Sequence, residues 1–313
     1  MRTGPIGAAE LVRTVVAVPP MALDAQRRIR FEECRKLVAR CEAAGVRAIL
    51  WGGNAQLAHW PVSRLGELFE MAEETAGPDT IAIPSIGPDW GKLVDGARAL
   101  AATAFPCAMA LPMPGPTTAE GIAAALREAA LRSGKPLLAY LREPGYLAPE
   151  TLARLLAEGV VLAVKYGIPP PEHGRDAFLD DLVAAIGGAR LISGAGELAA
   201  LVHLPEYGLA GFTSGSVCLA PRRSMRILAA LRRGAREEAE ELARPIAAFE
   251  AARERSGAVR VLHEAVRLAG LADTGPLLPM LGPSPPASLV EIEAAARALL
   301  AAEAELNGER EGG

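Results

Sequence analysis

The chain has 313 residues, of which 50% are hydrophobic and 22% are charged, and its formal net charge is −4. This composition is typical of a globular protein with a large core, and the small, scattered acidic excess excludes an electrostatic footprint for nucleic acid or an anionic membrane. The opening MRTGPIGAAELVRTVV has no signal-peptide core, and no apolar stretch is long enough and free enough of charge to span a bilayer. We therefore expect a soluble, cytoplasmic protein.

Short apolar runs alternate with amphipathic helical stretches along most of the chain. Helical patterns occupy 25–45, 61–77, 89–103, 118–134 and 176–188, with short helices from Pro149 and before Gly208. The apolar runs between them predict eight strands, within 11–20, 46–54, 80–88, 107–114, 135–145, 160–168, 189–197 and 208–216. Eight alternating units predict a (β/α)8 TIM barrel with parallel strands. An open doubly wound sheet is the alternative, but no GxGxxG follows the first strand.

The pattern changes after Ala220, where helix follows helix. We expect three parts: a barrel over 1–220, a C-terminal helical region over 221–306 and a disordered tail over 307–313. A proline-rich break, PLLPMLGPSPPAS, interrupts the helical region. The Arg and Glu residues of the helical region are interleaved with almost no aromatic residues, which indicates a solvated or subunit-facing surface rather than a nucleic-acid interface.

The cysteines and histidines do not form a metal-binding pattern. The four cysteines lack CxxC spacing, and the four histidines show neither HxH nor HExxH spacing. We expect no metal site and no disulfide framework, with the thiols reduced in the core.

Lys165 stands in the apolar run VVLAVKYGI, residues 160–168, near the end of the sixth predicted strand. Lysine is rare here, because only Lys36, Lys92, Lys135 and Lys165 are lysines among the 33 basic residues. A lysine in this place suggests a role that only an amine can fill. If the side chain faces inward, desolvation favours the neutral amine, a nucleophile for a carbonyl substrate. The alternation leaves its direction open, and the alternative is an ion-paired or solvent-reaching lysine.

Several landmarks resemble the dihydrodipicolinate synthase / N-acetylneuraminate lyase superfamily of class I aldolases and dehydratases. They are AVKYG around Lys165, LLAYLREPGYL around Tyr140, the turn WGGNAQ, the segment GFTSGSVCLAP and the break GPLLPMLGP. Their order and spacing cover the chain from about Leu11 to Leu306. The resemblance implies that Lys165 forms an imine with the substrate and that Tyr140 transfers protons.

The same resemblance implies that small-molecule binding falls to residues at the ends of the other strands. These substrate-binding residues are Gly53, Asn54, Ala55, Arg142, Gly194 and Thr213. The Gly53–Asn54 turn would hold a carboxylate through backbone N–H groups, or it is only a tight connection between strand and helix. Arg142 would clamp a distal carboxylate, or it is surface charge.

Two departures from the family pattern bear on the activity. Family members that make dihydrodipicolinate have Gly-Thr-Thr-Gly-Glu after strand two, whereas this chain has Gly52, Gly53, Asn54, Ala55 and Gln56. The strand-four segment is PMPGPTT, without the tyrosine that the family lends to a neighbouring subunit. We therefore expect an aldolase or dehydratase acting on pyruvate or a related 2-oxo or sugar acid, not a true dihydrodipicolinate synthase. The resemblance also implies no metal or organic cofactor and a homo-oligomer, either a tetramer or a dimer.

Two other functions stay open. The segments SGAGE and TSGS follow strands seven and eight, where barrels often bind phosphate, so a phosphosugar-binding enzyme is one alternative. The missing relay groups motivate the other, a non-catalytic barrel that binds a 2-oxo acid.

Overall fold

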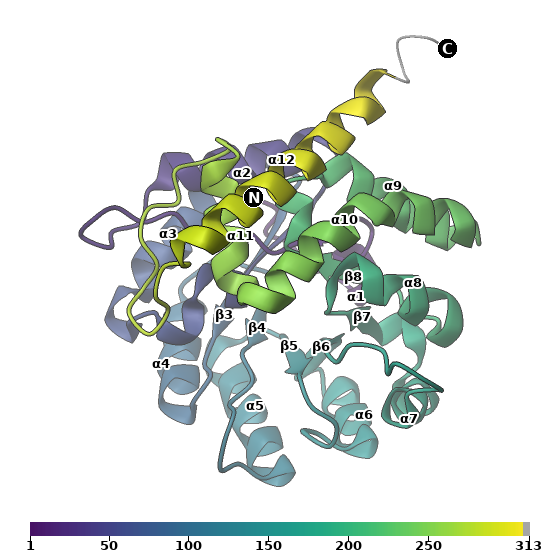
Figure 1. The fold of residues 1–313 in the computed structure, drawn as a ribbon. Helices are drawn as coiled ribbons and strands as arrows, with labels where there is room; N and C mark the ends of the chain where they lie inside the picture. Colours follow the sequence, from purple (N-terminus) through teal and green to yellow (C-terminus); the bar gives the residue numbers. More distant parts are fainter. Residues whose placement is uncertain (309–313) are drawn as a thin grey trace.

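The structure, a computed structural model, describes residues 1–308 and shows a closed barrel of eight parallel strands (Figure 1). The strands follow one another around the barrel in chain order: β1 Val16–Ala17, β2 Ala48–Trp51, β3 Ile81–Ile86, β4 Ala108–Ala110, β5 Leu137–Leu141, β6 Val161–Tyr166, β7 Leu191–Ser193 and β8 Gly211–Ser214. The closing pair, β1 with β8, is parallel like the others. The predicted (β/α)8 barrel is therefore confirmed, and the open doubly wound sheet is excluded.

Helices surround the barrel and extend beyond it. They are α1 Ala8–Leu11, α2 Phe31–Ala43, α3 Leu65–Thr75, α4 Trp90–Ala101, α5 Ala119–Ser133, α6 Pro149–Ala157, α7 Ala177–Ile186, α8 Gly196–Tyr207, α9 Pro221–Arg232, α10 Arg236–Ser256, α11 Ala258–Leu268 and α12 Pro286–Gly308. The predicted tail over 307–313 lies outside the described residues, except for its first two, which continue α12. The division of the chain at residue 220 stays a prediction.

The first predicted strand is shorter than expected. The segment 11–20 was expected to be extended throughout, but Leu11 ends the helix α1 and only Val16 and Ala17 form the strand. The pairing continues one residue further, because Val18 N donates to Ser214 O at 2.8 Å. The residues before and after the turn are equally apolar, so the hydrophobic pattern did not distinguish the end of the helix from the start of the strand.

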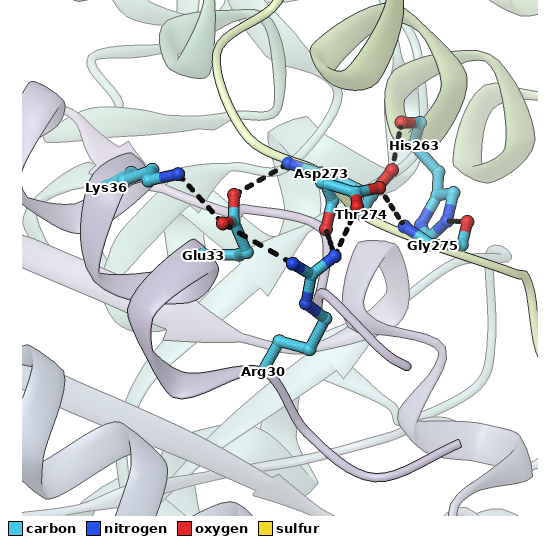
Figure 2. A network of polar contacts seen from close by, with 7 residues as sticks. All are labelled: Arg30, Glu33, Lys36, His263, Asp273, Thr274 and Gly275. Atoms are coloured by element: carbon cyan, nitrogen blue, oxygen red, sulfur yellow. Dashed lines mark hydrogen bonds and ion pairs between the residues drawn. The ribbon is translucent and has the colours of Figure 1, made fainter. Parts of the chain in front are cut away.

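The C-terminal extension is fixed to the end of the barrel at which the strands finish. Figure 2 shows a polar network that joins α2 to the segment after α11. Asp273 N donates to Glu33 Oε2 at 2.7 Å, and Arg30 pairs with the Asp273 carboxylate. The buried imidazole of His263 contacts Gly275 O at 2.9 Å.

The same segment also contacts the turn after β2. Leu278 N donates to Gln56 Oε1 at 2.7 Å, and α11 packs against the short 3-10 helix Gly53–Ala55. The extension therefore helps to hold the rim of the barrel in place.

Among the described residues, none of the helices is apolar enough over a sufficient length to cross a membrane. All four cysteines are buried free thiols, as predicted.

Candidate active site at the C-terminal end of the barrel

The direction of Lys165 follows from its neighbour Tyr166. The Tyr166 hydroxyl donates to the Asp176 carboxylate, and its ring lies 6.4 Å from that of Phe178 in α7. Tyr166 therefore points outward to the helical layer. Successive side chains of a strand point to opposite faces, so Lys165 points into the barrel. Its side chain is buried, and its residue is only 5% exposed.

Tyr140 lies beside Lys165 on the neighbouring strand. The two residues are paired in the register of β5 and β6, and Lys165 Nζ lies 4.0 Å from the centroid of the Tyr140 ring. The face of a phenol ring stabilises an ammonium group at this distance. Within residues 1–308, no carboxylate lies within ion-pair distance of Lys165 Nζ. The ion-paired alternative for Lys165 therefore does not hold.

Two glycines make room for this pair. A Cβ atom on Gly194, which follows β7, would lie 2.9 Å from Lys165 Cγ and 2.9 Å from Gly167 Cα. A Cβ atom on Gly167 would lie 2.5 Å from Tyr140 Cε2. Real Cβ atoms do not approach this closely, so both positions need glycine. The structure thus places Gly194 against the stem of Lys165.

The turn after β2 contains the three residues that were predicted to bind a carboxylate. Gly53 is exposed and lines the cavity described below, whereas Ala55 is fully buried. The Asn54 side chain ties the turn to the first strand, because its Nδ2 donates to Val18 O at 2.8 Å. Of the three, Gly53 is the residue that faces the cavity. Gly53 is the first residue of the 3-10 helix, so its backbone N–H has no acceptor within that helix.

A cavity of about 540 Å³ opens at this end of the barrel, with Tyr140 in its wall. Gly53, Arg142, Glu143, His59 and Tyr146 also line it. Arg142 is exposed and forms no ion pair with any described residue, so its guanidinium is available to an anion. We refer to this space as the polar cavity.

Tyr146 is a residue of the polar cavity that sequence reasoning missed. It follows β5 by a few residues, and its hydroxyl accepts a hydrogen bond from Met113 N at 3.1 Å. Burial raises the pKa of this phenol, which therefore stays protonated at neutral pH. A tyrosine in a Pro-Gly loop immediately after a barrel strand is a signal that marks it in the sequence.

Thr213 lies on the other side of the barrel mouth. Its neighbour Ser214 contacts Glu197 of α8, so Thr213 faces the interior, where it is buried. Thr213 and Gly194 do not line the polar cavity. The predicted residues therefore form two groups that meet at Tyr140: Lys165 with Gly194 inside the barrel, and Gly53 with Arg142 at its rim.

No group of three or more His, Cys, Asp or Glu side chains within residues 1–308 is arranged to hold a metal ion.

Comparison with known proteins supports the fold. No protein-family model matches the chain, and no curated protein sequence matches it. Solved structures do match: a dihydrodipicolinate synthase from Bacillus clausii has 21% identity and a TM-score of 0.80, covering 94% of this chain and 98% of the other. An N-acetylneuraminate lyase from Fusobacterium nucleatum has 13% identity and a TM-score of 0.78, covering 93% and 99%.

The sialic acid aldolase of Ruminococcus gnavus is also similar, both as the wild type and as a catalytic-lysine mutant. The mutant has 14% identity and a TM-score of 0.79, covering 97% of this chain and 99% of the other. At these identities the comparisons establish a shared fold over nearly the whole length. They confirm the predicted resemblance in fold.

Proposed function

We propose that the protein is a class I lyase that binds pyruvate or a related 2-oxo acid as an imine on Lys165. The observation that carries this proposal is the buried Lys165 amine, which has no carboxylate partner among residues 1–308 and lies against Tyr140 at the end of the barrel where the strands finish. The similarity in fold to an aldolase with a catalytic lysine supports it.

The chemistry follows from the properties of a primary amine in a buried site. Lys165 Nζ attacks the ketone carbon, and loss of water gives an imine whose protonated nitrogen withdraws electrons. A proton then leaves the adjacent carbon, and the resulting enamine attacks an aldehyde or expels a leaving group. The reverse sequence cleaves a carbon–carbon bond. Aldol addition, retro-aldol cleavage and dehydration all pass through the same enamine.

Tyr140 serves as the proton carrier in this proposal. Imine formation needs a proton for the departing hydroxyl and a group to take one from the amine. Tyr140 lies on the strand next to Lys165 and also lines the polar cavity, whose lining does not include Lys165 itself.

The polar cavity contains two groups that can bind an anion, Gly53 N–H and Arg142, although the carboxylates of Asp89 and Glu143 also line it. Neither group has a partner among residues 1–308, so the N–H of Gly53 is available to the carboxylate of the 2-oxo acid and the guanidinium of Arg142 to a second anionic or polar group. The family threonine and the borrowed tyrosine are replaced here, so we do not assign dihydrodipicolinate synthesis.

The phosphosugar alternative receives less support. A Cβ atom on Gly215, after β8, would lie 2.8 Å from Asn54 Nδ2 and 2.8 Å from Leu262 Cδ2. The turn after β8 is therefore packed against its neighbours, which leaves little room for a phosphate beside it.

Exchange of the pyruvate methyl hydrogens in D2O tests the proposal. The exchange needs the enamine, so NMR should show rapid loss of the methyl signal with the wild type and only the background rate with Lys165→Arg. Lys135→Arg is the matched control, because Lys135 Nζ donates to Thr103 O at 2.9 Å before β5 begins, at the opposite end of the barrel. Equal exchange by Lys165→Arg and the wild type contradicts the proposal.

A further inference from the structure

A second cavity shares a wall with the polar cavity. It has a volume of about 580 Å³ and lies between the outer side of β4 and β5 and the helices α4 and α5. We call it the apolar cavity, because none of its lining residues is charged. Five residues line both cavities: Pro88, Leu111, Met113, Tyr140 and Tyr146. The space therefore adjoins the proposed catalytic tyrosine.

Small side chains account for the apolar cavity. Ala110 and Ala139 lie on the strands, and Gly121 and Ala125 lie on α5 opposite them. Protein interiors are normally close-packed, with few voids larger than a water molecule. Here the other walls of the cavity are formed by apolar residues farther from the barrel axis, including Leu93, Ile122 and Trp90. Trp90 is 61% exposed. A volume of this size is within the usual range for ligand sites.

Tyr146 supplies a polar group where the two cavities meet. Its hydroxyl oxygen accepts from Met113 N at 3.1 Å, and within residues 1–308 its own hydrogen has no acceptor. That hydrogen is therefore available to an oxygen atom bound between the cavities. A neutral phenol in this position is a suitable donor to a carbonyl oxygen.

We propose that the second substrate is an aldehyde with an aryl or branched alkyl group, whose tail occupies the apolar cavity and whose carbonyl oxygen accepts from Tyr146. This inference rests on the proposed imine chemistry of Lys165. The electron pair of the enamine forms a bond to the aldehyde carbon. The carbonyl π pair moves to oxygen, which takes the proton of Tyr146, and water then hydrolyses the imine. The products are a 4-hydroxy-2-oxo acid with an apolar group on C4 and the free Lys165 amine, and the phenolate regains a proton from solvent.

Aldol addition of pyruvate to benzaldehyde and to glycolaldehyde tests this inference. We expect kcat/KM to be about 10- to 100-fold higher for benzaldehyde than for glycolaldehyde. Each methylene-sized group buried in an apolar pocket raises kcat/KM by roughly tenfold or more. Ala125→Trp fills the apolar cavity and should lower the benzaldehyde-to-glycolaldehyde ratio at least about tenfold. Ala124→Leu is the matched control, since Ala124 is exposed on the same helix and does not line the cavity. Ala125→Leu, a smaller intrusion, replaces Ala125→Trp should that variant fail to fold.

The outcomes separate this inference from the proposed function. Adduct formation on Lys165 with a ratio that Ala125→Trp leaves unchanged overturns the apolar-aldehyde inference and keeps the imine chemistry. Absence of any pyruvate adduct overturns both. Sedimentation velocity tests whether a second copy of the chain occupies the apolar cavity. If Ala125→Trp dissociates an oligomer and leaves the benzaldehyde-to-glycolaldehyde ratio unchanged, the cavity belongs to a subunit contact and the inference is refuted. Tyr146→Phe should reduce kcat for benzaldehyde while the pyruvate adduct still forms, and unchanged kcat contradicts the role of Tyr146.

Discussion

Replacing Gly194 with alanine should disturb the position of the proposed nucleophile without removing any polar group. The added Cβ atom would lie 2.9 Å from Lys165 Cγ, 2.9 Å from Gly167 Cα and 2.9 Å from Tyr166 O. Two of these three atoms belong to the backbone of β6 and its continuation, so no change of rotamer relieves them. Gly194 does not have a positive φ, and the cost is therefore steric.

The magnitude follows from the nature of this overlap. Forcing one extra carbon into a packed interior costs about 1–3 kcal/mol, which for a chain of this size lowers Tm by roughly 2–10 °C. The lysine stem is the one movable partner among the three. We expect it to shift, so the rate of imine formation with pyruvate should fall by about tenfold or more, since misplacing a reacting group by a fraction of an ångström is costly.

Calorimetry and borohydride trapping of the pyruvate adduct measure the two effects. Gly66→Ala is the matched control, because Gly66 is exposed in α3 and its added Cβ atom would contact nothing within 4 Å. That variant should keep the wild-type trapping rate, and its Tm should equal or slightly exceed the wild-type value, because alanine favours a helix more than glycine does. Wild-type values for Gly194→Ala would refute the packing argument for the Lys165 site.

Three further predictions concern the proton carrier, a buried histidine and the C-terminal extension. Tyr140→Phe should lower kcat about 10²- to 10⁴-fold by removing general acid–base catalysis, measured by steady-state kinetics, and a smaller effect would argue for another proton carrier. Burial lowers the pKa of His203 to about 4 from an ordinary value of 6.5. The unfolded chain therefore binds more protons between these values, and the stability that neutral His203 contributes, at most about 3 kcal/mol, is lost as pH falls through this window. Urea unfolding from pH 7 to 4 should show a shallower decline for His203→Gln, and parallel curves would contradict this assignment. A Cβ atom on Gly275, where φ is 65°, would overlap Leu23 O, so Gly275→Ala should lower the free energy of unfolding by more than about 1 kcal/mol in urea titration, and an unchanged value would show that the segment is free to move.

The barrel was predictable because its signal repeats. Each strand is a short apolar run that ends in a turn residue, and each is followed by an amphipathic helix, so an error in one unit does not change the fold. The start of β1 was predicted too early because Leu11 and Val16 have similar hydrophobicity, yet Leu11 ends a helix and Val16 begins a strand. Hydrogen bonds to distant strands, such as that from Val18 N to Ser214 O, decide such cases.

The pairing of Lys165 with Tyr140 came from the resemblance to a family, and the structure added its geometry. Both faces of β6 are apolar, so sequence alternation did not tell which face Lys165 uses. The contacts of Tyr166 with α7 resolved this point. The roles assigned to Lys165 and Tyr140 stay predictions until chemistry tests them.

The cavities were beyond the reach of the sequence. Asn54 was predicted to bind substrate, but its side-chain nitrogen donates to Val18 O, a contact that the sequence does not indicate. Tyr146 and Ala125 belong to segments that sequence reasoning assigned only to a loop and a helix, and they meet Tyr140 through tertiary packing. A cavity is the space that neighbouring helices and strands leave unfilled, and no local sequence pattern predicts it.

Reductive trapping of the pyruvate adduct tests the central claim most directly. The protein is incubated with pyruvate and borohydride, its intact mass is measured, and the modified peptide is mapped. We predict a single reduced adduct on Lys165, absent from Lys165→Arg and present in Lys135→Arg. A folded wild-type protein that forms no adduct with pyruvate, 2-oxobutyrate or 2-oxoglutarate, or that forms one on another lysine, would contradict the assignment of Lys165 as the imine-forming residue.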